Sequence, residues 1–286
     1  MRFGLALSGG GLRGVAHIGV LKALEEYRLR PSWISGASAG SIVAGLYAYG
    51  YSPNQMEELA LNLDRRYIDP DVCGIVYGVL QLVMGKEPIT DGIIKGKYLE
   101  RFFNKLTKGA HIRNVKIPLA ISAVDINTAK TIMFVSSKEK MPPDDHHTQY
   151  IDDVYLYEAI RASIAIPVIF KPMFIQNMRL VDGGVTENLP IDVLRKMGAK
   201  KILGVDLGYS GQIRKGVNNI FEIGSQAIDI MAYQITRLKS EGIDFILRPG
   251  IYDVSLSDVD KIPEIIKRGY EATIENIKMI KKALNS

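Results

Sequence analysis

Short runs of apolar residues alternate along this chain with longer segments in which apolar residues recur every three or four positions. The run 3–7 predicts a first strand, and 12–27 predicts a helix with a buried stripe of Val15, Ile18, Leu21 and Leu24. Further strands are predicted at 33–35, 119–127, 131–136, 170–175, 179–181, 201–207 and 245–248. Further helices are predicted at 38–49, 53–66, 97–106, 155–163, 190–197, 220–239 and 263–284. This alternation is typical of βαβ units, so we expect an α/β fold with a mainly parallel central sheet flanked by helices.

Two segments do not follow the alternation. Residues 72–85 are apolar on every side and uncharged, yet shorter than the roughly 18 residues that span a bilayer. We interpret 67–95 as a lid or membrane-facing flap, with a buried core helix as the open alternative. The polar stretch 138–153 is expected to be an exposed loop. No repeat or linker divides the chain, so 1–286 is interpreted as one domain, with 217–286 as its C-terminal helices.

Composition narrows the function classes. The chain has 286 residues, 47% hydrophobic and 23% charged, with a net charge of +5. Its lysines are scattered, which favours anionic surfaces such as lipid headgroups over nucleic acid. The single cysteine, Cys73, excludes an internal disulfide, and one Cys with four His offers no zinc-ligand spacing. The N-terminus enters a glycine-rich turn without a signal-peptide apolar region. We therefore expect a cytoplasmic protein with peripheral membrane contact; its oligomeric state is left open.

The first chemical motif is the turn Gly9-Gly10-Gly11-Leu12-Arg13-Gly14 after the first strand. Its glycine spacing matches the dinucleotide-binding fingerprint, but the second strand ends without the acidic residue that holds the ribose. A phosphate-binding P-loop is excluded because no Lys-Ser/Thr pair follows the glycines. Adjacent glycines expose backbone N–H groups at a helix N-terminus, which suits an anion or a reaction oxyanion. A plain structural turn is the alternative.

The second motif is Gly36-Ala37-Ser38-Ala39-Gly40, which joins a predicted strand to a predicted helix. The G-x-S-x-G pattern in this setting predicts a nucleophile elbow, with small neighbours leaving the Ser38 hydroxyl accessible. The alternative is that Ser38 only caps the helix.

A serine nucleophile needs a base, and the histidines are poorly placed to supply one. No histidine follows His147, whereas α/β-hydrolases place theirs late in the chain. His17 is expected to be packed in the core, and His146 and His147 to be solvated. Asp182, followed by Gly183 and Gly184, lies at a predicted strand end and is a candidate base that acts directly. A triad through His146 and His147 stays open, as does a simple Asp-Gly-Gly turn.

Taken together, these three motifs resemble the patatin-like phospholipase family, in particular its bacterial members grouped with neuropathy target esterase. The segments 16–24 and 161–167 also resemble that family, and the resemblance covers about residues 1–207. It implies a single three-layer α/β/α domain and a serine esterase that cleaves phospholipid or lysophospholipid esters.

The resemblance also implies roles for the residues. Ser38 would be the nucleophile and Asp182 its base, without histidine, and the acyl-enzyme would form on Ser38. The oxyanion would bind at the glycine turn 9–11, with the N–H groups of Gly10 and Gly11 as donors. Arg13 would either hold that turn in shape or meet a phosphate. The supporting motif residues are Arg13, Gly14, Gly36, Gly40, Gly183 and Gly184. A lipid ester is the expected partner, and no metal or organic cofactor is expected. The alternatives are a nucleotide-binding oxidoreductase and a non-catalytic lipid-binding regulator of the same fold.

Overall fold

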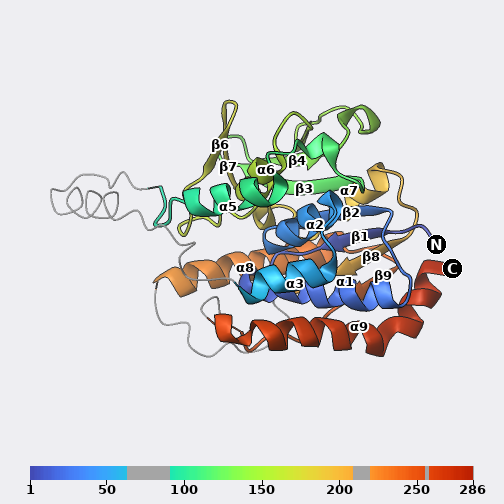
Figure 1. Ribbon diagram of the computed structural model, residues 1–286. Helices are drawn as coiled ribbons and strands as arrows, with labels where there is room; N and C mark the ends of the chain where they lie inside the picture. The colour runs from blue at the N-terminus through green and yellow to red at the C-terminus, as the bar shows by residue number, and fades with distance from the viewer. Residues whose placement is uncertain (63–90, 209–219, 255–257, 286) are drawn as a thin grey trace.

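The computed structural model describes residues 1–62, 91–208, 220–254 and 258–285 (Figure 1). Within them a single sheet runs in the order β5-β4-β3-β2-β1-β8-β9, with β7 paired to β3 and β6 paired to β7. The strands are β1 (Gly4–Leu7), β2 (Trp33–Ala37), β3 (Leu119–Asp125), β4 (Lys130–Val135), β5 (Thr148–Ile151), β6 (Met173–Ile175), β7 (Met178–Asp182), β8 (Ile202–Val205) and β9 (Phe245–Leu247).

The five strands β9, β8, β1, β2 and β3 are mutually parallel, and β1 lies at their centre. The helices are α1 (Ala16–Glu26), α2 (Ala39–Tyr49), α3 (Pro53–Leu61), α5 (Lys97–Thr107), α6 (Leu156–Ser163), α7 (Asp192–Lys196), α8 (Ile220–Lys239) and α9 (Ile262–Asn285). The predicted α/β architecture with a mainly parallel sheet and flanking helices is therefore confirmed.

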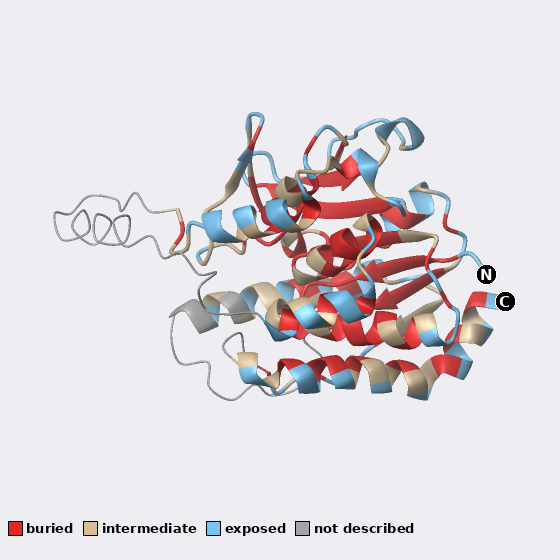
Figure 2. Ribbon diagram, viewed as in Figure 1, coloured by how far each residue is buried: buried red, intermediate tan, exposed pale blue. Residues whose placement is uncertain are grey.

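Both faces of the sheet are covered, which explains why its central strands are apolar at nearly every position. All residues of β1 and β3 are buried, and Figure 2 shows the strands as the buried middle layer. The main core joins one face to α1, α2, α6 and α9. The opposite face is covered by the short α7 and its flanking segments, through a smaller cluster that includes Leu189, Leu194 and Ile202.

Several predicted elements differ in detail. The helix predicted at 12–27 begins as a 3-10 turn, Gly11–Val15, before α1. The predicted exposed loop 138–153 contains β5, whose Tyr150 is buried against the cluster around Val193. The helix predicted at 53–66 is confirmed as α3, which ends at Leu61 among the described residues and begins with a capping box between Ser52 and Gln55. The segment 217–286 contains β9 as well as helices. Most of the predicted flap 67–95 lies outside the described residues.

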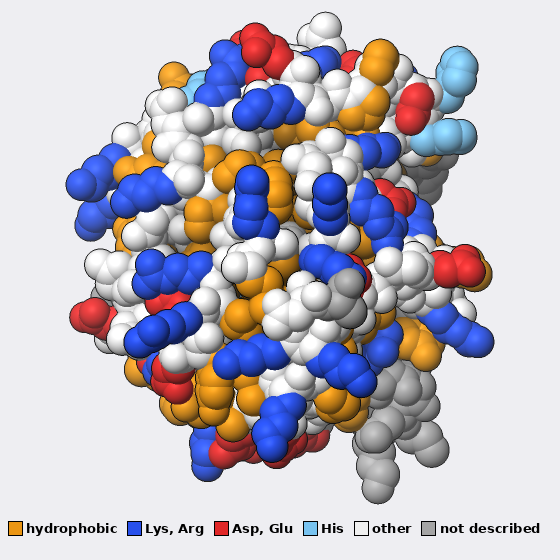
Figure 3. Space-filling model, turned by 90° about the vertical axis from the view of Figure 1, so that its right-hand side faces the viewer, with side chains coloured by type: hydrophobic (Ala, Val, Ile, Leu, Met, Phe, Trp, Pro, Cys, Tyr) orange, Lys and Arg blue, Asp and Glu red, His pale blue; other side chains and the backbone are white. Residues whose placement is uncertain are grey.

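Many basic side chains lie at the end of the molecule where both chain termini lie. Figure 3 views that end, and Lys and Arg side chains are spread widely over it. Cations precede four of the parallel strands, namely Arg2, Arg28, Arg30, Lys116, Lys200 and Lys201. The carboxyl ends of those strands, where α/β sites form, lie at the other end. Among the described helices, none is both long and apolar enough to cross a bilayer.

Candidate active site

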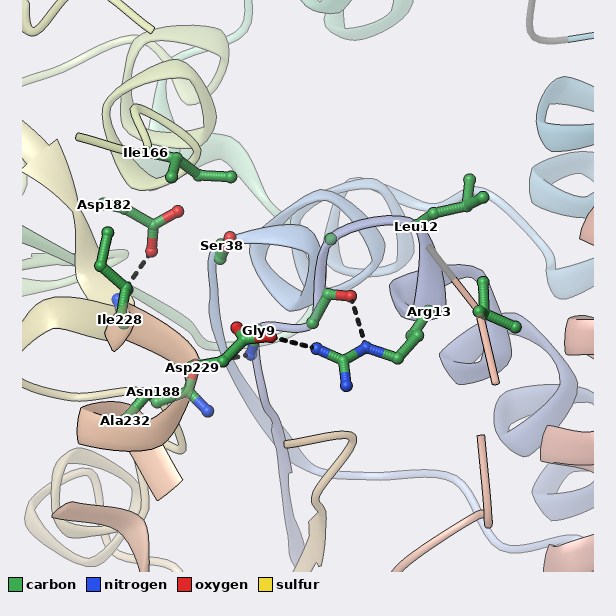
Figure 4. A pocket seen from close by; sticks show the side chains of 14 residues that line it. Gly9, Leu12, Arg13, Ser38, Ile166, Asp182, Asn188, Ile228, Asp229 and Ala232 are labelled. Atoms are coloured by element: carbon green, nitrogen blue, oxygen red, sulfur yellow. Dashed lines mark hydrogen bonds and ion pairs between the residues drawn. The ribbon is translucent and has the colours of Figure 1, made fainter. Parts of the chain in front are cut away.

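The three glycine motifs meet at the carboxyl ends of neighbouring strands. The turn 9–11 follows β1, Ser38 follows β2, and β1 and β2 are paired directly through Leu7 and Gly36. Asp182 is the last residue of β7. All three motifs line one small cavity of about 50 Å³, which Figure 4 shows from close by.

Ser38 and Asp182 are brought together by strand β3. On one edge, β3 pairs in parallel with β2 up to Ala37, which lies opposite Ser122. Its other edge is occupied by β4 along residues 120–125. β7 therefore pairs on the β2 edge, running the opposite way, and ends with Asp182 opposite Ala123. The two strand ends face each other along one edge, so the serine and the carboxylate become neighbours.

Ser38 has the backbone conformation of a strained turn. Its φ of 49° and ψ of −128° are rare for a residue with a side chain, and such conformations cost on the order of 1–3 kcal/mol. Although Ser38 occupies the N-cap position of α2, its side chain makes no capping hydrogen bond. Its N–H donates to Ser163 Oγ at 2.9 Å, and its carbonyl accepts from Ser41 Oγ at 2.6 Å. The alternative of Ser38 as a simple helix cap is therefore wrong.

Asp182 is a buried carboxylate with one oxygen satisfied and one without a partner. Oδ1 accepts the Gly184 N–H at 2.7 Å, whereas Oδ2 is buried without a hydrogen-bond partner among the described residues. In Figure 4 this second oxygen is directed to the side where Ser38 lies. Burial raises the pKa of Asp182 to about 7, and the nearby charge of Asp229 adds to the rise. The Ser38 hydroxyl and the Gly184 N–H oppose it. A carboxyl with this pKa suits a general base at neutral pH.

Hydrogen bonds with Asn188 and Arg13 fix the conformation of the glycine turn. The Gly9 N–H donates to both the backbone carbonyl and the side-chain Oδ1 of Asn188, each at 3.2 Å. Arg13 donates from Nε to the Gly10 carbonyl at 3.0 Å and pairs with Asp229 of α8 at 2.9 Å. The N–H groups of Gly10 and Gly11 have no acceptor among the described residues. Of the three glycines expected at the oxyanion site, Gly10 and Gly11 therefore carry the available donors.

The motif glycines allow close approach around the nucleophile. A Cβ on Gly9 would lie 2.6 Å from Asn188 Oδ1 and 2.9 Å from Ser38 Cβ. A Cβ on Gly40 would lie 2.6 Å from the Ser8 carbonyl oxygen. Added Cβ atoms would also overlap neighbouring atoms, mostly backbone, at Gly14, Gly36 and Gly183, and would be tight at Gly184. The contacts of Gly9 with Ser38 and of Gly14 with Ala39 pack the glycine turn directly against the Ser38 motif.

The histidines do not reach this cavity. His17 is fully buried in α1, where its Nε2 donates to the Ser8 carbonyl at 2.8 Å, and burial lowers its pKa to about 4. His146 and His147 are exposed, as predicted. No histidine lines the cavity that holds Ser38 and Asp182. The open alternative of a triad through the 146–147 pair finds no support in this arrangement.

A second, larger hollow of about 460 Å³ opens beside the first. It shares Gly11, Leu12, Ser38 and Ile166 with the small cavity and continues between α1, α2, α3 and α5. Among the described residues that line it, Ser38 supplies the only polar side chain. The site therefore combines a small polar cavity with an extended apolar one.

Four residues at the site were not singled out from the sequence: Ser163, Asn188, Asp229 and Ser41. Each touches a motif residue through hydrogen bonds or an ion pair, and the role of none was predicted, although Ser163 lies in the segment 161–167 that resembles the family. Among the described residues, no cluster of three or more His, Cys, Asp or Glu side chains could hold a metal ion.

Comparison with known proteins identifies the family of this chain. A family model described as patatin-like phospholipase matches residues 5–195. Lysophospholipase NTE1 of Scheffersomyces stipitis is 30% identical over 205 residues, covering 72% of this chain and 12% of that protein. Human patatin-like phospholipase domain-containing protein 6 is 29% identical over 206 residues, covering 71% of this chain and 13% of that protein. The chain thus spans only 12–13% of the length of these two relatives.

Two solved structures share the fold. VipD from Legionella pneumophila has a TM-score of 0.53 at 14% identity, covering 98% of this chain and 67% of its own. ExoU in its complex with SpcU from Pseudomonas aeruginosa has a TM-score of 0.53 at 18% identity. That match covers 100% of this chain and 52% of ExoU. At such identities the likeness concerns the fold alone.

Proposed function

Because this chain belongs to the patatin-like phospholipase family, we propose that it hydrolyses carboxylic ester bonds of phospholipids or lysophospholipids. The observation that carries the proposal is the unpartnered Asp182 Oδ2, buried in the cavity that Ser38 lines. A buried carboxylate oxygen without a hydrogen bond is costly, and a role as proton acceptor explains why it is kept.

In the proposed reaction, Ser38 and Asp182 act as a dyad. Asp182 Oδ2 takes the hydroxyl proton as Ser38 Oγ attacks the ester carbonyl carbon. The resulting oxyanion accepts hydrogen bonds from the N–H groups of Gly10 and Gly11. Each such donor typically contributes about 2.7–4 kcal/mol to barrier lowering. The intermediate collapses to an acyl-Ser38 ester while the proton passes to the departing alcohol oxygen.

Water then completes the reaction. Asp182 accepts a proton from the attacking water, and hydroxide adds to the acyl carbonyl within the same oxyanion site. Collapse returns the proton to Ser38 Oγ and releases the fatty acid. Asn188 and the Arg13–Asp229 pair do not touch the reacting atoms in this scheme. They hold the glycine turn so that its N–H groups keep their direction.

A lipid ester has to be collected from a membrane or micelle, and one segment beside the site suits that task. Val168 is 55% exposed and Phe174 is 63% exposed, both shortly after Ile166 of the catalytic cavity. Val168 has a φ of 72°, which is unusual for a β-branched residue, so the backbone is strained at this position. Arg179 lies with its guanidinium 5.9 Å from the Phe174 ring. Exposed apolar groups with a nearby cation suit the membrane interface.

The dyad is tested by labelling with a fluorophosphonate probe and by turnover of p-nitrophenyl butyrate and lysophosphatidylcholine. Wild type should label and turn over, whereas folded Ser38→Ala and Asp182→Asn should do neither above background. Ser240→Ala is the matched control, because the Ser240 hydroxyl likewise donates to the carbonyl three residues earlier, that of Arg237, but Ser240 lines neither cavity. Labelling of Ser38→Ala at the wild-type level would refute the dyad. A wild type that binds lipid vesicles without labelling would indicate a non-catalytic regulator.

A further inference from the structure

The large hollow follows one face of the helix that the nucleophile begins. Ser38 directly precedes α2, and the hollow is lined in turn by Ala39, Ile42, Val43 and Leu46. These positions are spaced by three, one and three residues, which places them on one side of a helix. With a rise of about 1.5 Å per residue, Ile42 lies roughly 6 Å and Leu46 roughly 12 Å along the axis from Ser38.

The opposite walls have the same character. α3 contributes Met56, Leu59 and Ala60, and α5 contributes four large side chains, Leu99, Phe102, Phe103 and Leu106. Of the lining residues that the structure describes, none is charged, and the single polar side chain is that of Ser38. Ligand pockets usually have volumes of about 300–1,000 Å³ and apolar linings, and this open hollow of about 460 Å³ has both properties. Apolar cavities bind apolar molecules and exclude water.

We propose that this hollow is the binding site for one hydrocarbon chain of the substrate, and that Ile42 and Leu46 set the chain length. The inference rests on the proposed function, because it takes Ser38 as the atom to which the acyl group is joined. Continuity with the catalytic cavity identifies the occupant, since a chain bonded to Ser38 Oγ enters the hollow through Leu12 and Ile166.

The helix geometry gives the proposed site a length scale. An extended covalent chain advances about 1.2 Å per bond, from 3.3–3.6 Å per three-bond residue. An acyl chain therefore reaches Ile42 after roughly five bonds and Leu46 after roughly ten. Each buried methylene changes the equilibrium by about fourfold, so the preference for longer esters should rise steeply up to that point.

The test combines variants that block the hollow at two depths with a series of ester substrates of increasing chain length. We would measure kcat/KM for p-nitrophenyl esters from butanoyl to hexadecanoyl with wild type, Ile42→Trp and Leu46→Trp. Leu46→Trp should reduce turnover of dodecanoyl and longer esters by about tenfold or more, with butanoyl turnover within about twofold of wild type. Ile42→Trp should impose the same loss from octanoyl upward. Met279→Trp, on an exposed position of α9, is the control for added bulk.

Two further measurements distinguish a blocked chain site from a folding defect and from a change in the rate of ester hydrolysis. Leu46→Ala should extend the preference to longer chains, which a folding defect would not do. Binding of a fluorescent long-chain fatty acid to Ser38→Ala should weaken by about tenfold on adding Leu46→Trp.

The outcomes separate the two proposals. If Ser38 is required for turnover but both tryptophan variants keep the wild-type chain-length profile, the acyl chain lies elsewhere and this inference is overturned. If Ser38→Ala turns over normally, the proposed function itself fails. Fatty-acid binding that remains sensitive to Leu46→Trp would then still assign the hollow to a hydrocarbon chain.

Discussion

Arg13 of the glycine turn and Asp229 of α8 form an ion pair 2.9 Å long at the edge of the catalytic cavity. The Arg13 side chain is almost fully buried, and its Nε holds the Gly10 carbonyl. Breaking one partner of a buried pair is costly because the other charge is left uncompensated. Asp229 therefore affects both the geometry of the turn and, through its charge, the titration of Asp182.

Replacing Asp229 with Asn should move the pH dependence of hydrolysis as well as its rate. Removing the negative charge lowers the pKa of Asp182, so the acidic limb of the kcat/KM profile should shift to lower pH. The freed Arg13 should also loosen the glycine turn, with a fall in kcat of about tenfold or more. Asp192→Asn, which breaks the exposed pair with Arg195, should change neither. An unshifted acidic limb in Asp229→Asn would contradict the electrostatic coupling.

The raised pKa of Asp182 also predicts opposite trends for activity and stability. Activity requires the ionised base, so it should rise with pH and level off above the pKa of about 7. In the unfolded chain this carboxyl has an ordinary pKa near 3.9, so the folded state binds more protons between the two values. Wild type should therefore lose stability as pH rises from about 4 to 7, by up to about 4 kcal/mol.

Asp182→Asn provides the control for that linkage. Asn can still accept the Gly184 N–H through its Oδ1 but cannot ionise. The variant should be inactive, should match wild type in denaturant midpoint near pH 4, and should exceed it above pH 7. Equal midpoints at pH 8 would show that Asp182 carries no desolvation penalty.

Gly40 should tolerate no side chain, because the first turn of α2 packs against the end of β1. A Cβ at Gly40 would meet the Ser8 carbonyl oxygen at 2.6 Å, and backbone atoms cannot move aside individually. We expect Gly40→Ala to lose about 1–3 kcal/mol of stability, measured by urea unfolding. Gly224→Ala is the matched control in α8, where an added Cβ meets nothing within 4 Å. That change should leave stability unchanged or raise it by up to about 1 kcal/mol.

Val168 should separate membrane binding from stability. Asn adopts positive φ more readily than Val, so Val168→Asn should raise the free energy of unfolding by about 1 kcal/mol. The same change, and Phe174→Asp, should weaken sedimentation with phosphatidylcholine–phosphatidylserine vesicles by several fold. Leu238→Asp alters an even more exposed apolar residue, on α8, and should leave vesicle binding near wild type. An equal loss of vesicle binding in all three variants would mean that the protein does not bind membranes through the face that carries Val168 and Phe174.

The sequence predicted the elements and the chemistry that local patterns encode. Glycine spacing and the G-x-S-x-G pattern depend on neighbouring residues, so the turn 9–14 and the elbow at Ser38 could be located from sequence. The strands β3 and β4 were predicted for the same reason, since each is a local run of apolar residues, at 119–127 and 131–136. β5 was missed because its first residues are polar, and its burial depends on packing against α7.

The supporting residues could not be predicted, because they arrive from far along the chain. Asn188 is 179 positions from Gly9, Asp229 is 216 from Arg13, and Ser163 is 125 from Ser38. Each is a common polar residue whose role comes from one tertiary contact. The conflict between Gly9 as an oxyanion donor and Gly9 as the partner of Asn188 is likewise visible only after folding.

Strand β3 sets the distance between Ser38 and Asp182. β2 and β7 end next to each other on one edge of β3, with Ala37 opposite Ser122 and Asp182 opposite Ala123. The number of β3 residues between these two pairing positions therefore determines how far Ser38 lies from Asp182. A slip of β7 by one residue would carry Asp182 about 3.3 Å along that edge and turn its side chain to the opposite face of the sheet. Insertions in the surrounding loops leave this count unchanged. The loops around the sheet can therefore vary without changing how far Ser38 lies from Asp182, whereas one residue inserted between Ser122 and Ala123 would separate the two in every such variant.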